Sequence, residues 1–464
     1  MNLKYNMIFH TVLLTIISII LFTIYTISNQ TLDNSKSSLI YIIGMSLYGV
    51  FILLNFYFHE NSFYGISAFC MTFLFCEKGF YNFENISLLS NLFMFTILGF
   101  IIHLIKYKPK LYISHYSLST FIFIFTLSLS GLGVKEYDPN YPVYNPWYMP
   151  FLVIIVGLLI LFLLNYFECS NKSTLEDVSI YFKSFVILIG YEILFYVFYK
   201  LNGNFQEFFK CKTIFIGIGH PNTVAIILQL TLPFMLYFSF KRNNFINTVF
   251  FYLNFLLIVL TMSRGAILVS TILMVGYIIY LLIKNRKNAH INLLCHLSVF
   301  VFFLVIILCL FIKNKETCIL FLKNLFSNIK HLNGREFLWE YVFNHWYYNP
   351  IFGIGIFSNS YWKPEIWDTF QFAHSTFFHT LWMAGIVGFI GLCIHLLDKY
   401  IFVIKSKKDI SLMLMFYLCS GLYGTFDVTY YNLHFTTYLL VIMFLYSSVV
   451  YKSKHYTLSS NYLF

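Results

Sequence analysis

Residues 291–313 read INLLCHLSVFVFFLVIILCLFIK and decide the fold, because no charged side chain interrupts this stretch before its last residue. A helix needs about 20 such residues to cross the roughly 30 Å hydrocarbon core of a bilayer. Comparable apolar runs recur along the chain from Met7 to Val450. We therefore predict an all-α polytopic membrane protein with about 12–14 transmembrane helices.

The amino-acid composition excludes several classes of protein. Of the 464 residues, 59% are hydrophobic and only 11% are charged, whereas about 25% of the residues of a soluble domain are charged. An ordinary cytosolic enzyme, a disordered chain and a nucleic-acid-binding protein are therefore excluded. The formal net charge of +11 is interpreted as a signal of loop topology, not of a polyanionic partner.

About 14 candidate spans can be placed along the chain by their length and apolar character. They cover residues 7–27, 38–58, 61–76, 87–105, 117–134, 148–167, 179–199, 219–240, 244–262, 264–283, 291–313, 375–397, 410–425 and 432–450. If the N-terminus is cytoplasmic, the short inner loops carry most of the Lys and Arg residues, as the positive-inside rule requires. Both termini are therefore predicted to be cytoplasmic.

One long loop separates the last three predicted spans from the others. The predicted segments are N-terminal helices at 1–212, further helices at 213–313, this loop at 314–373 and C-terminal helices at 374–464. The loop faces outward in the predicted topology and contains two amphipathic helical patterns, at about 316–329 and 335–347. Gly353-Ile354-Gly355 predicts a tight turn after them. Loops of this length usually act as lids or binding elements.

Two of the four arginines lie on the predicted outer side of the membrane, where the positive-inside rule does not predict positive charge. Arg264 lies in a very short connection between two predicted spans, where a guanidinium needs an anion or access to water. The alternative is an arginine that extends to the lipid headgroups. Arg335 begins a predicted helix, where the helix dipole disfavours a cation unless an anion is near. The alternative there is a surface ion pair with Glu336 or Glu340.

A few other polar residues lie at the outer ends of predicted spans or within them. His374 begins the twelfth span and is a candidate base, although such histidines are more often structural. Glu192 lies within the seventh span, where a carboxylate either faces a functional cavity or is a neutral structural group. His220-Pro221-Asn222 marks the start of the eighth span, and Asp427 borders the last outer loop.

Several motifs of other enzyme classes are missing from the sequence. No Asp-x-Asp pair is present for a metal-dependent sugar-nucleotide site, and no zinc-binding His-Glu-x-x-His motif occurs. A glycine-rich phosphate-binding loop of the Walker type is also missing. These observations predict chemistry without a metal ion or another cofactor, and without nucleotide hydrolysis.

Four stretches together resemble the bacterial O-antigen ligase/polymerase superfamily, which includes the Wzy-type polysaccharide polymerases. They are Gly-His-Pro-Asn-Thr at 219–223, Ser-Arg-Gly at 263–265, Asn-Gly-Arg-Glu-Phe-Leu-Trp at 333–339 with Asn-Pro-Ile-Phe-Gly-Ile-Gly at 349–355, and His-Ser-Thr-Phe-Phe-His-Thr-Leu-Trp-Met-Ala-Gly-Ile-Val-Gly at 374–388. The resemblance covers roughly residues 213–395. It departs from the family at Ser375, where the family often has Asn after the histidine.

The resemblance implies a GT-C-like glycosyltransferase in the bacterial cytoplasmic membrane, with its active site on the outer side. It would polymerise an O-antigen or capsule by moving the growing glycan from undecaprenyl diphosphate to the next lipid-linked repeat unit. Arg264 and Arg335 would hold the diphosphate, and His374 would act on the acceptor hydroxyl. Candidate substrate-binding residues are Glu192, His220, Asn222, Ser375 and Asp427. The implied partners are the lipid-linked oligosaccharide, the bilayer and a chain-length regulator.

Two alternatives stay open at this point. A ligase of the same superfamily would move the finished glycan to lipid A core or to a protein, so it would share the donor and differ only in the acceptor. A flippase for lipid-linked oligosaccharides is an alternative from another class. A transporter of that kind should show paired halves and a charged central path, and the sequence has no visible repeat.

Overall fold

The computed structural model describes ten stretches of the chain. They are residues 3–31, 34–75, 86–111, 117–133, 148–210, 221–242, 244–326, 335–355, 373–406 and 409–427. Every regular element within them is a helix. Eight of these helices are long and apolar enough to cross a membrane, and five shorter helices are apolar too. The prediction of an all-α polytopic membrane protein is confirmed, while the predicted span at 432–450 lies outside the described residues.

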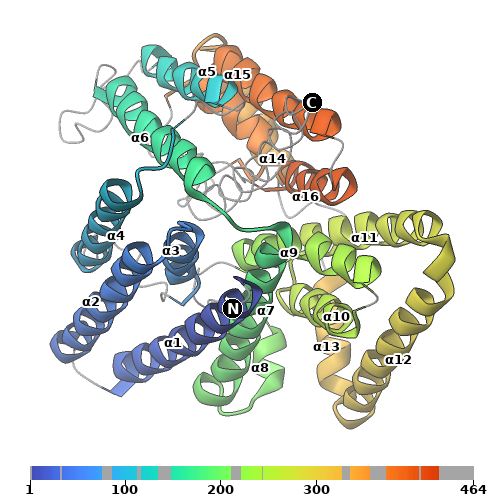
Figure 1. Ribbon diagram of the computed structural model, residues 1–464. Coiled ribbons are helices and arrows are strands. Elements are labelled where there is room, and N and C mark those ends of the chain that lie inside the picture. The colour runs from blue at the N-terminus through green and yellow to red at the C-terminus, as the bar shows by residue number, and fades with distance from the viewer. Residues whose placement is uncertain are drawn as a thin grey trace, which may run out of the picture. The chain divides into compact units, whose positions relative to one another are not determined.

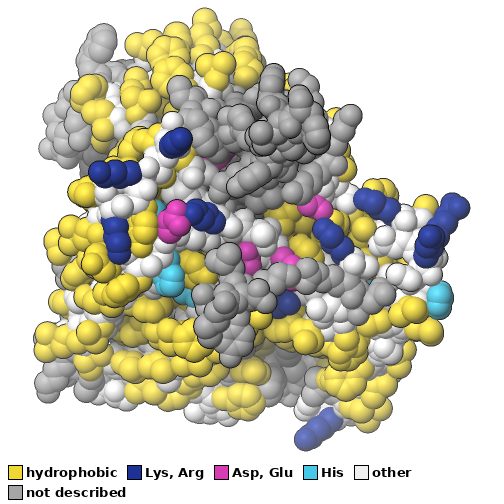
Figure 2. Space-filling model, in the orientation of Figure 1, with side chains coloured by type: hydrophobic (Ala, Val, Ile, Leu, Met, Phe, Trp, Pro, Cys, Tyr) yellow, Lys and Arg dark blue, Asp and Glu magenta, His cyan; other side chains and the backbone are white. Residues whose placement is uncertain are grey.

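The chain folds into two compact units, each built from two separate stretches of sequence. Unit 1 comprises Met1–Lys110 and Ser170–Ser327, and unit 2 comprises Leu111–Cys169 and Asn328–Phe464. On the face in view in Figure 2, apolar side chains form broad areas of the surface. Such areas are expected where a helical protein faces lipid instead of water.

Unit 1 is built around one helix that is buried on all sides, α9 (Pro221–Arg242). Its other helices are α1 (Leu3–Thr31), α2 (Asn34–Phe58), α3 (Phe63–Phe75), α4 (Ile86–Tyr107), α7 (Leu175–Phe195), a π-helical turn (Tyr196–Lys200), α8 (Phe205–Lys210), α10 (Phe245–Leu260), α11 (Arg264–Lys284), a 3-10 turn (Arg286–Asn288), α12 (Ala289–Lys313) and α13 (Lys315–Phe326). Residues 221–240 of α9 are all buried, and the helix contacts α7, α10 and α11 (Figure 1). A helix that is apolar all round, as this one nearly is, packs in this way.

Unit 2 is organised along its longest helix, α15 (Thr376–Ser406). The other elements of the unit are α5 (Ser117–Ser128), a 3-10 turn (Leu129–Gly133), α6 (Tyr148–Ser170), α14 (Arg335–Trp346) and α16 (Ile410–Tyr423). α5 lies alongside α15 (Figure 1). The Phe123 ring stacks on His395, with 5.3 Å between the ring centroids, and the Ser119 hydroxyl donates to the Asp398 carboxylate at 2.6 Å.

α15 is interrupted within its membrane-spanning stretch. Gly385 has φ +62° and ψ −163°, which breaks the helical backbone, and the segment 349–355 enters the break. Four backbone hydrogen bonds join them, from Ile354 N to Trp382 O (3.0 Å), from Gly355 N to Met383 O (2.9 Å), from Ile386 N to Pro350 O (2.9 Å) and from Val387 N to Ile351 O (3.2 Å). An unsatisfied backbone group costs several kcal/mol in lipid, so this exchange is what allows the helix to be broken there.

The same exchange explains two glycines of the 349–355 and 374–388 motifs. A Cβ atom on Gly353 would lie 2.5 Å from the Met383 carbonyl carbon, and one on Gly385 would lie 2.2 Å from the Ile351 carbonyl oxygen. Both glycines also have positive φ, a conformation that other residues adopt at a cost. The predicted tight turn at Gly353-Ile354-Gly355 is therefore part of a long-range contact with α15.

We predict that Gly385→Ala destabilises the folded protein by about 2 kcal/mol or more, through left-handed backbone strain and overpacking. The measurement is the thermal midpoint of the purified protein in detergent. Gly276→Ala in α11 is the control, because nothing lies within 4 Å of the Cβ position there. Equal midpoints for the two variants would contradict the role of the α15 break.

Candidate functional site

The residues before α15 are held by the turn that follows α16. Thr376 N donates to Gly424 O at 2.8 Å, and the Thr376 hydroxyl donates to Asp427 O at 3.1 Å. Ser375 is buried, and its carbonyl accepts a hydrogen bond from His379 N at 2.9 Å. His374 has φ +46°. A residue other than glycine is uncommon at positive φ, and such strain is often found at functional sites.

His374 lies against Asp427. The His374 Nδ1 and Asp427 Oδ1 atoms are 3.4 Å apart, and the two side chains are 39% and 14% exposed. Nδ1 is buried and makes no well-aligned hydrogen bond with any described residue, so the contact with Asp427 is a loose electrostatic one. Because the ring is partly exposed while Nδ1 is buried, the accessible edge of the imidazole is the one that carries Nε2. A carboxylate beside Nδ1–H favours the tautomer in which Nε2 can accept a proton.

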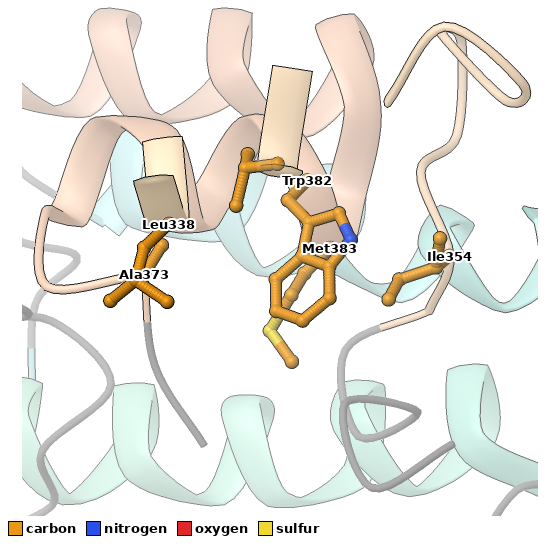
Figure 3. Packing of buried hydrophobic residues seen from close by; sticks show 6 residues of the cluster. Leu338, Ile354, Ala373, Trp382 and Met383 are labelled. Atoms are coloured by element: carbon orange, nitrogen blue, oxygen red, sulfur yellow. The ribbon is translucent and has the colours of Figure 1, made fainter. Parts of the chain in front are cut away.

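α14 packs onto the same end of α15 through Trp339. The indole Nε1 donates to Ala373 O at 2.9 Å, one residue before His374. The indole ring also stacks on Phe378, with centroids 5.2 Å apart and 19° between the planes. Beneath this contact lies a buried apolar cluster drawn in Figure 3, made of Leu338, Val342, Ile354, Ala373, Trp382 and Met383. α14 is therefore fixed to the segment that carries His374.

Tyr341 packs at the edge of this cluster. Burial raises the pKa of its hydroxyl, so the ring stays neutral at physiological pH. Its ring stacks on His345 with 3.8 Å between centroids, and His345 Nδ1 lies 2.8 Å from Tyr341 O. These contacts join successive turns of α14 beside the cluster.

Arg335 is the first residue of α14 and lies on its packed side. It precedes Trp339 by four residues and Val342 by seven, so the three side chains share one helix face. Within the part of the chain that the structure describes, Arg335 makes no ion pair, and the alternative pair with Glu336 or Glu340 is not formed. Arg335 is a partly buried residue at this helix N-terminus, on the same helix face as Trp339, which contacts the segment before His374.

Arg264 begins α11 in unit 1. Met262, which directly precedes the Ser-Arg-Gly motif, has φ +55° and is another residue other than glycine at positive φ. The guanidinium Nη2 donates to Asn324 O at 3.2 Å, in the last turn of α13. A cation at the end of a helix is favoured by the helix dipole. Since Arg335 and His374 belong to unit 2, the meeting of all three side chains stays a prediction.

The remaining candidate residues are placed as follows. Glu192 lies in the last turn of α7, just before the π-helical turn, with 1% of its surface exposed. Its Oε1 atom is buried and has no hydrogen-bond partner among the residues that the structure describes. Asn222 is buried in the first turn of α9. His220 lies outside the described residues.

Sequence reasoning missed how Trp339 is used. In the sequence it is one of many aromatic residues, yet its ring N–H donates to the carbonyl of Ala373, beside His374. The only local signal was its position one turn after Arg335 on a helix. Within the described stretches, no group of three or more His, Cys, Asp or Glu residues is arranged to hold a metal ion.

The fold is that of a multi-pass helical membrane protein. The candidate polar residues that the structure describes lie at or near the ends of its helices. Residues 249–393 match the family model described as O-antigen ligase. This match, which covers less than half of the chain, supports the predicted resemblance to the O-antigen ligase/polymerase superfamily, whose members are glycosyltransferase-like enzymes. No curated protein matches the chain. The matched region includes Arg264, Arg335, His374 and Ser375, and leaves out Glu192, His220, Asn222 and Asp427.

The two tryptophans of α14 offer a matched test of this site. Trp339→Phe keeps the ring and removes the hydrogen bond to Ala373 O, so we expect about 1 kcal/mol less stability and slower glycan transfer. Trp346→Phe removes a similar bond, to Pro350 O in the segment that pairs with α15, and should slow transfer less than Trp339→Phe because it lies farther along α14 from the residue next to His374. Melting in detergent and transfer rates are the measurements. Equal transfer rates in both variants would show that the Trp339 contact does not position the site.

Proposed function

We propose that this protein is a glycosyltransferase that moves a glycan from undecaprenyl diphosphate to a hydroxyl acceptor. One observation carries the proposal. Arg335 and His374, both within the region matched to the O-antigen ligase family, lie on elements joined by the hydrogen bond from Trp339 to Ala373. A fixed cation and a partly exposed imidazole are the groups that this transfer requires.

In the proposed reaction, the bond between the anomeric carbon and the diphosphate oxygen breaks while the acceptor oxygen bonds to that carbon. Negative charge develops on the departing diphosphate. Arg335, with Arg264 as the second candidate, would stabilise it, because a guanidinium offers a planar set of charged donors. A preorganised donor of this kind is typically worth about 3–4 kcal/mol in the transition state.

His374 would take the proton of the acceptor hydroxyl at Nε2. Asp427 faces the other ring nitrogen and would stabilise the imidazolium that forms. The 3.4 Å separation is longer than a good hydrogen bond, as is common before a substrate is bound. Ser375, Glu192, His220 and Asn222 stay candidates for contacts with substrate. In this scheme the protein's own side chains provide the catalytic groups without a cofactor.

A polymerase and a ligase are equally supported, and the two proposals differ only in the acceptor. The resemblance of the sequence implies a polymerase, for which the acceptor is the next lipid-linked repeat unit of an O-antigen or capsule. The family model is described as O-antigen ligase and supports equally a ligase, for which the acceptor is lipid A core or a protein. Both use the same donor chemistry, so the residues discussed above serve either reaction.

The proposed location is the bacterial cytoplasmic membrane, with both termini inside and the reaction on the outer side. This orientation rests on the distribution of Lys and Arg over the predicted loops. Lys284, Arg286 and Lys287, which are exposed between α11 and α12, would then face the cytoplasm. The proposed partners are the lipid-linked oligosaccharide and, for a polymerase, a chain-length regulator.

A transfer assay with purified protein tests the proposal against a flippase. The protein in detergent is mixed with glycan-linked undecaprenyl diphosphate, and with either a second lipid-linked unit or lipid A core as acceptor. Transfer requires no closed membrane compartment, whereas flipping does. Longer lipid-linked glycans indicate a polymerase, and glycosylated core indicates a ligase. No product with any acceptor, from a protein that is folded, would contradict the proposed function.

For Arg335 we predict that Arg335→Ala lowers transfer by about 100-fold and that Arg335→Lys restores only part of the loss. Lysine keeps the charge but lacks the bidentate geometry of the guanidinium. Initial rates with the purified lipid-linked donor provide the measurement. Arg286, an exposed arginine between α11 and α12, is the control, and its Ala and Lys variants should behave as wild type. Wild-type rates in both Arg335 variants would remove it from the diphosphate site.

For His374 we predict that His374→Asn reduces transfer near neutral pH by about 100-fold or more, since a general base contributes at least that much. Asparagine tolerates the positive φ of this position, which separates loss of the imidazole from backbone strain. His290→Asn, at an exposed histidine of α12, is the matched control. Undiminished turnover of His374→Asn would show that His374 is not the base.

A further inference from the structure

α13 carries a stripe of exposed apolar side chains with lysines beside them. Lys315, Ile319, Leu322 and Phe326 are spaced as i, i+4, i+7 and i+11, which places them on one side of the helix. The three apolar members are 47%, 45% and 63% exposed, in that order. Lys323 is exposed at the border of the same side. We call these five residues the α13 exposed face.

The opposite side of α13 is packed within unit 1. Thr317 is buried on that side, and the helix contacts α8 and α12. Asn324 lies seven residues after Thr317, so both residues share one helix face. The Asn324 carbonyl accepts the hydrogen bond from Arg264. Packing and the bond to Arg264 therefore hold one side of the helix, and the α13 exposed face remains at the surface.

Both ends of α13 belong to the same side of the membrane. α11 and α12 are each long and apolar enough to span it, and only residues 285–288 join them. Two spans joined by so short a turn run in opposite directions, so the start of α11 and the end of α12 share one side. α13 begins one residue after α12, and its last turn accepts the bond from Arg264 at the start of α11. The helix therefore runs along the membrane surface and does not cross it.

The lipid interface fits the α13 exposed face by position. α12 leads directly into α13, and only 12% of the most apolar stretch of α12 is buried. Lipid is the expected cover of a spanning helix with so little packing. Ile312, which is 79% exposed at the end of α12, continues this surface to α13. The apolar stripe of α13 thus starts where a lipid-facing surface ends.

The charges of α13 fit lipid headgroups better than another protein. An amphipathic helix in the interface buries its apolar residues at the acyl boundary and directs Lys side chains to the headgroups. Lys313, Lys315 and Lys323 are exposed here, and α13 has one carboxylate, Glu316. Anionic headgroups attract such a set of lysines. Lysine is depleted in interfaces between proteins, which disfavours a protein as the occupant.

We propose that α13 is an interfacial anchor whose exposed face lies in the outer leaflet of the bilayer, and whose docking positions Arg264. The choice of leaflet follows the predicted topology, in which α12 ends outside. The Asn324 carbonyl is part of α13, so the membrane surface that holds the helix also holds the partner of the guanidinium. The lipid contact goes beyond the proposed function, and its effect on transfer rests on that function.

Photo-crosslinking of the full-length protein in a bacterial membrane tests the lipid contact directly. Benzoylphenylalanine, a photoreactive phenylalanine analogue, replaces Leu322 or Phe326 through stop-codon suppression. Phe302, a 62% exposed ring of α12, is the lipid-facing control. Glu316, exposed on the polar edge of α13, is the water-facing control. After irradiation, mass spectrometry of the labelled peptides identifies each adduct.

We expect phospholipid adducts with the analogue at Leu322, Phe326 and Phe302, and few or none at Glu316. Adducts to protein at both α13 positions, whether to a second copy or to another membrane protein, would overturn the inference. The same holds if neither α13 position gives a phospholipid adduct while Phe302 does. This test needs no transfer activity, so its result is independent of the proposed function.

Charge reversal tests the part played by the lysines. Lys315→Glu/Lys323→Glu is compared with wild type in nanodiscs of phosphatidylcholine, with and without anionic phosphatidylglycerol. Lys284→Glu/Lys287→Glu, between α11 and α12, is the matched control. In anionic nanodiscs we expect amide hydrogen exchange over residues 315–326 to be about tenfold faster in Lys315→Glu/Lys323→Glu, because the attraction of two lysines is lost. Exchange at the wild-type rate in this variant would overturn the inference.

Transfer rates in the same nanodiscs test the link to Arg264. We expect kcat of Lys315→Glu/Lys323→Glu to fall about fivefold in anionic nanodiscs, the lower range of coupling between two sites. In phosphatidylcholine alone it should equal that of wild type, which a merely structural defect would not allow. Faster exchange with unchanged kcat would overturn the positioning of Arg264 by α13. Absence of transfer in folded wild-type protein would contradict the proposed function alone, because crosslinking and exchange still decide the docking.

Discussion

In the hydrocarbon core of a bilayer, every backbone N–H and C=O group needs a partner within the protein. Unit 2 meets this requirement at an interruption of its longest helix. α15 is broken at Gly385, and the segment 349–355 provides the missing donors and acceptors. This segment follows α14 directly. The exchange therefore fixes one end of α14, and the bond from Trp339 to Ala373 fixes the other side of the helix near its start.

Electrostatics at the ends of α14 and α15 depend on this fixed geometry. Arg335 is a cation at a helix N-terminus, where the dipole disfavours positive charge unless an anion is bound. His374 is held at positive φ beside Asp427, with one ring edge accessible. A cation at a helix N-terminus and a non-glycine residue at positive φ each carry a cost in stability. Such costs are commonly retained where a site is preorganised for a charged substrate.

Much of the fold could be predicted from sequence, because bilayer length and helix-start chemistry act locally. The apolar runs identified the membrane helices, α9 begins at Pro221, and the helix predicted from Arg335 to Tyr347 is found as α14 (Arg335–Trp346). The pairing of Gly353 with the break at Gly385 could not be predicted, since their contact joins positions 32 residues apart in the sequence. In the sequence alone, Gly353 indicates only a local turn, and Gly385 gives no sign of its distant partner.

The candidate site was less predictable than the fold. Arg264, Arg335 and Glu192 could be identified because each is a charged residue in an unusual place for a membrane protein. Their partners, however, depend on tertiary structure. For Arg264 the partner is the carbonyl of Asn324, a helix-end contact with no sequence signature. The bond from Trp339 to Ala373 joins a loop helix to a membrane helix, and only the folded chain shows that it lies beside His374.

The central claim is that Arg335 and His374 are held together to act on a lipid diphosphate at the outer side of the membrane. The most direct measurement is a cryo-electron microscopy structure of the protein in lipid nanodiscs with undecaprenyl diphosphate bound. The account predicts diphosphate density within hydrogen-bonding distance of the Arg335 guanidinium, with the His374 ring facing the same space. Density for the diphosphate at another place on the protein, with Arg335 and His374 empty, would contradict it.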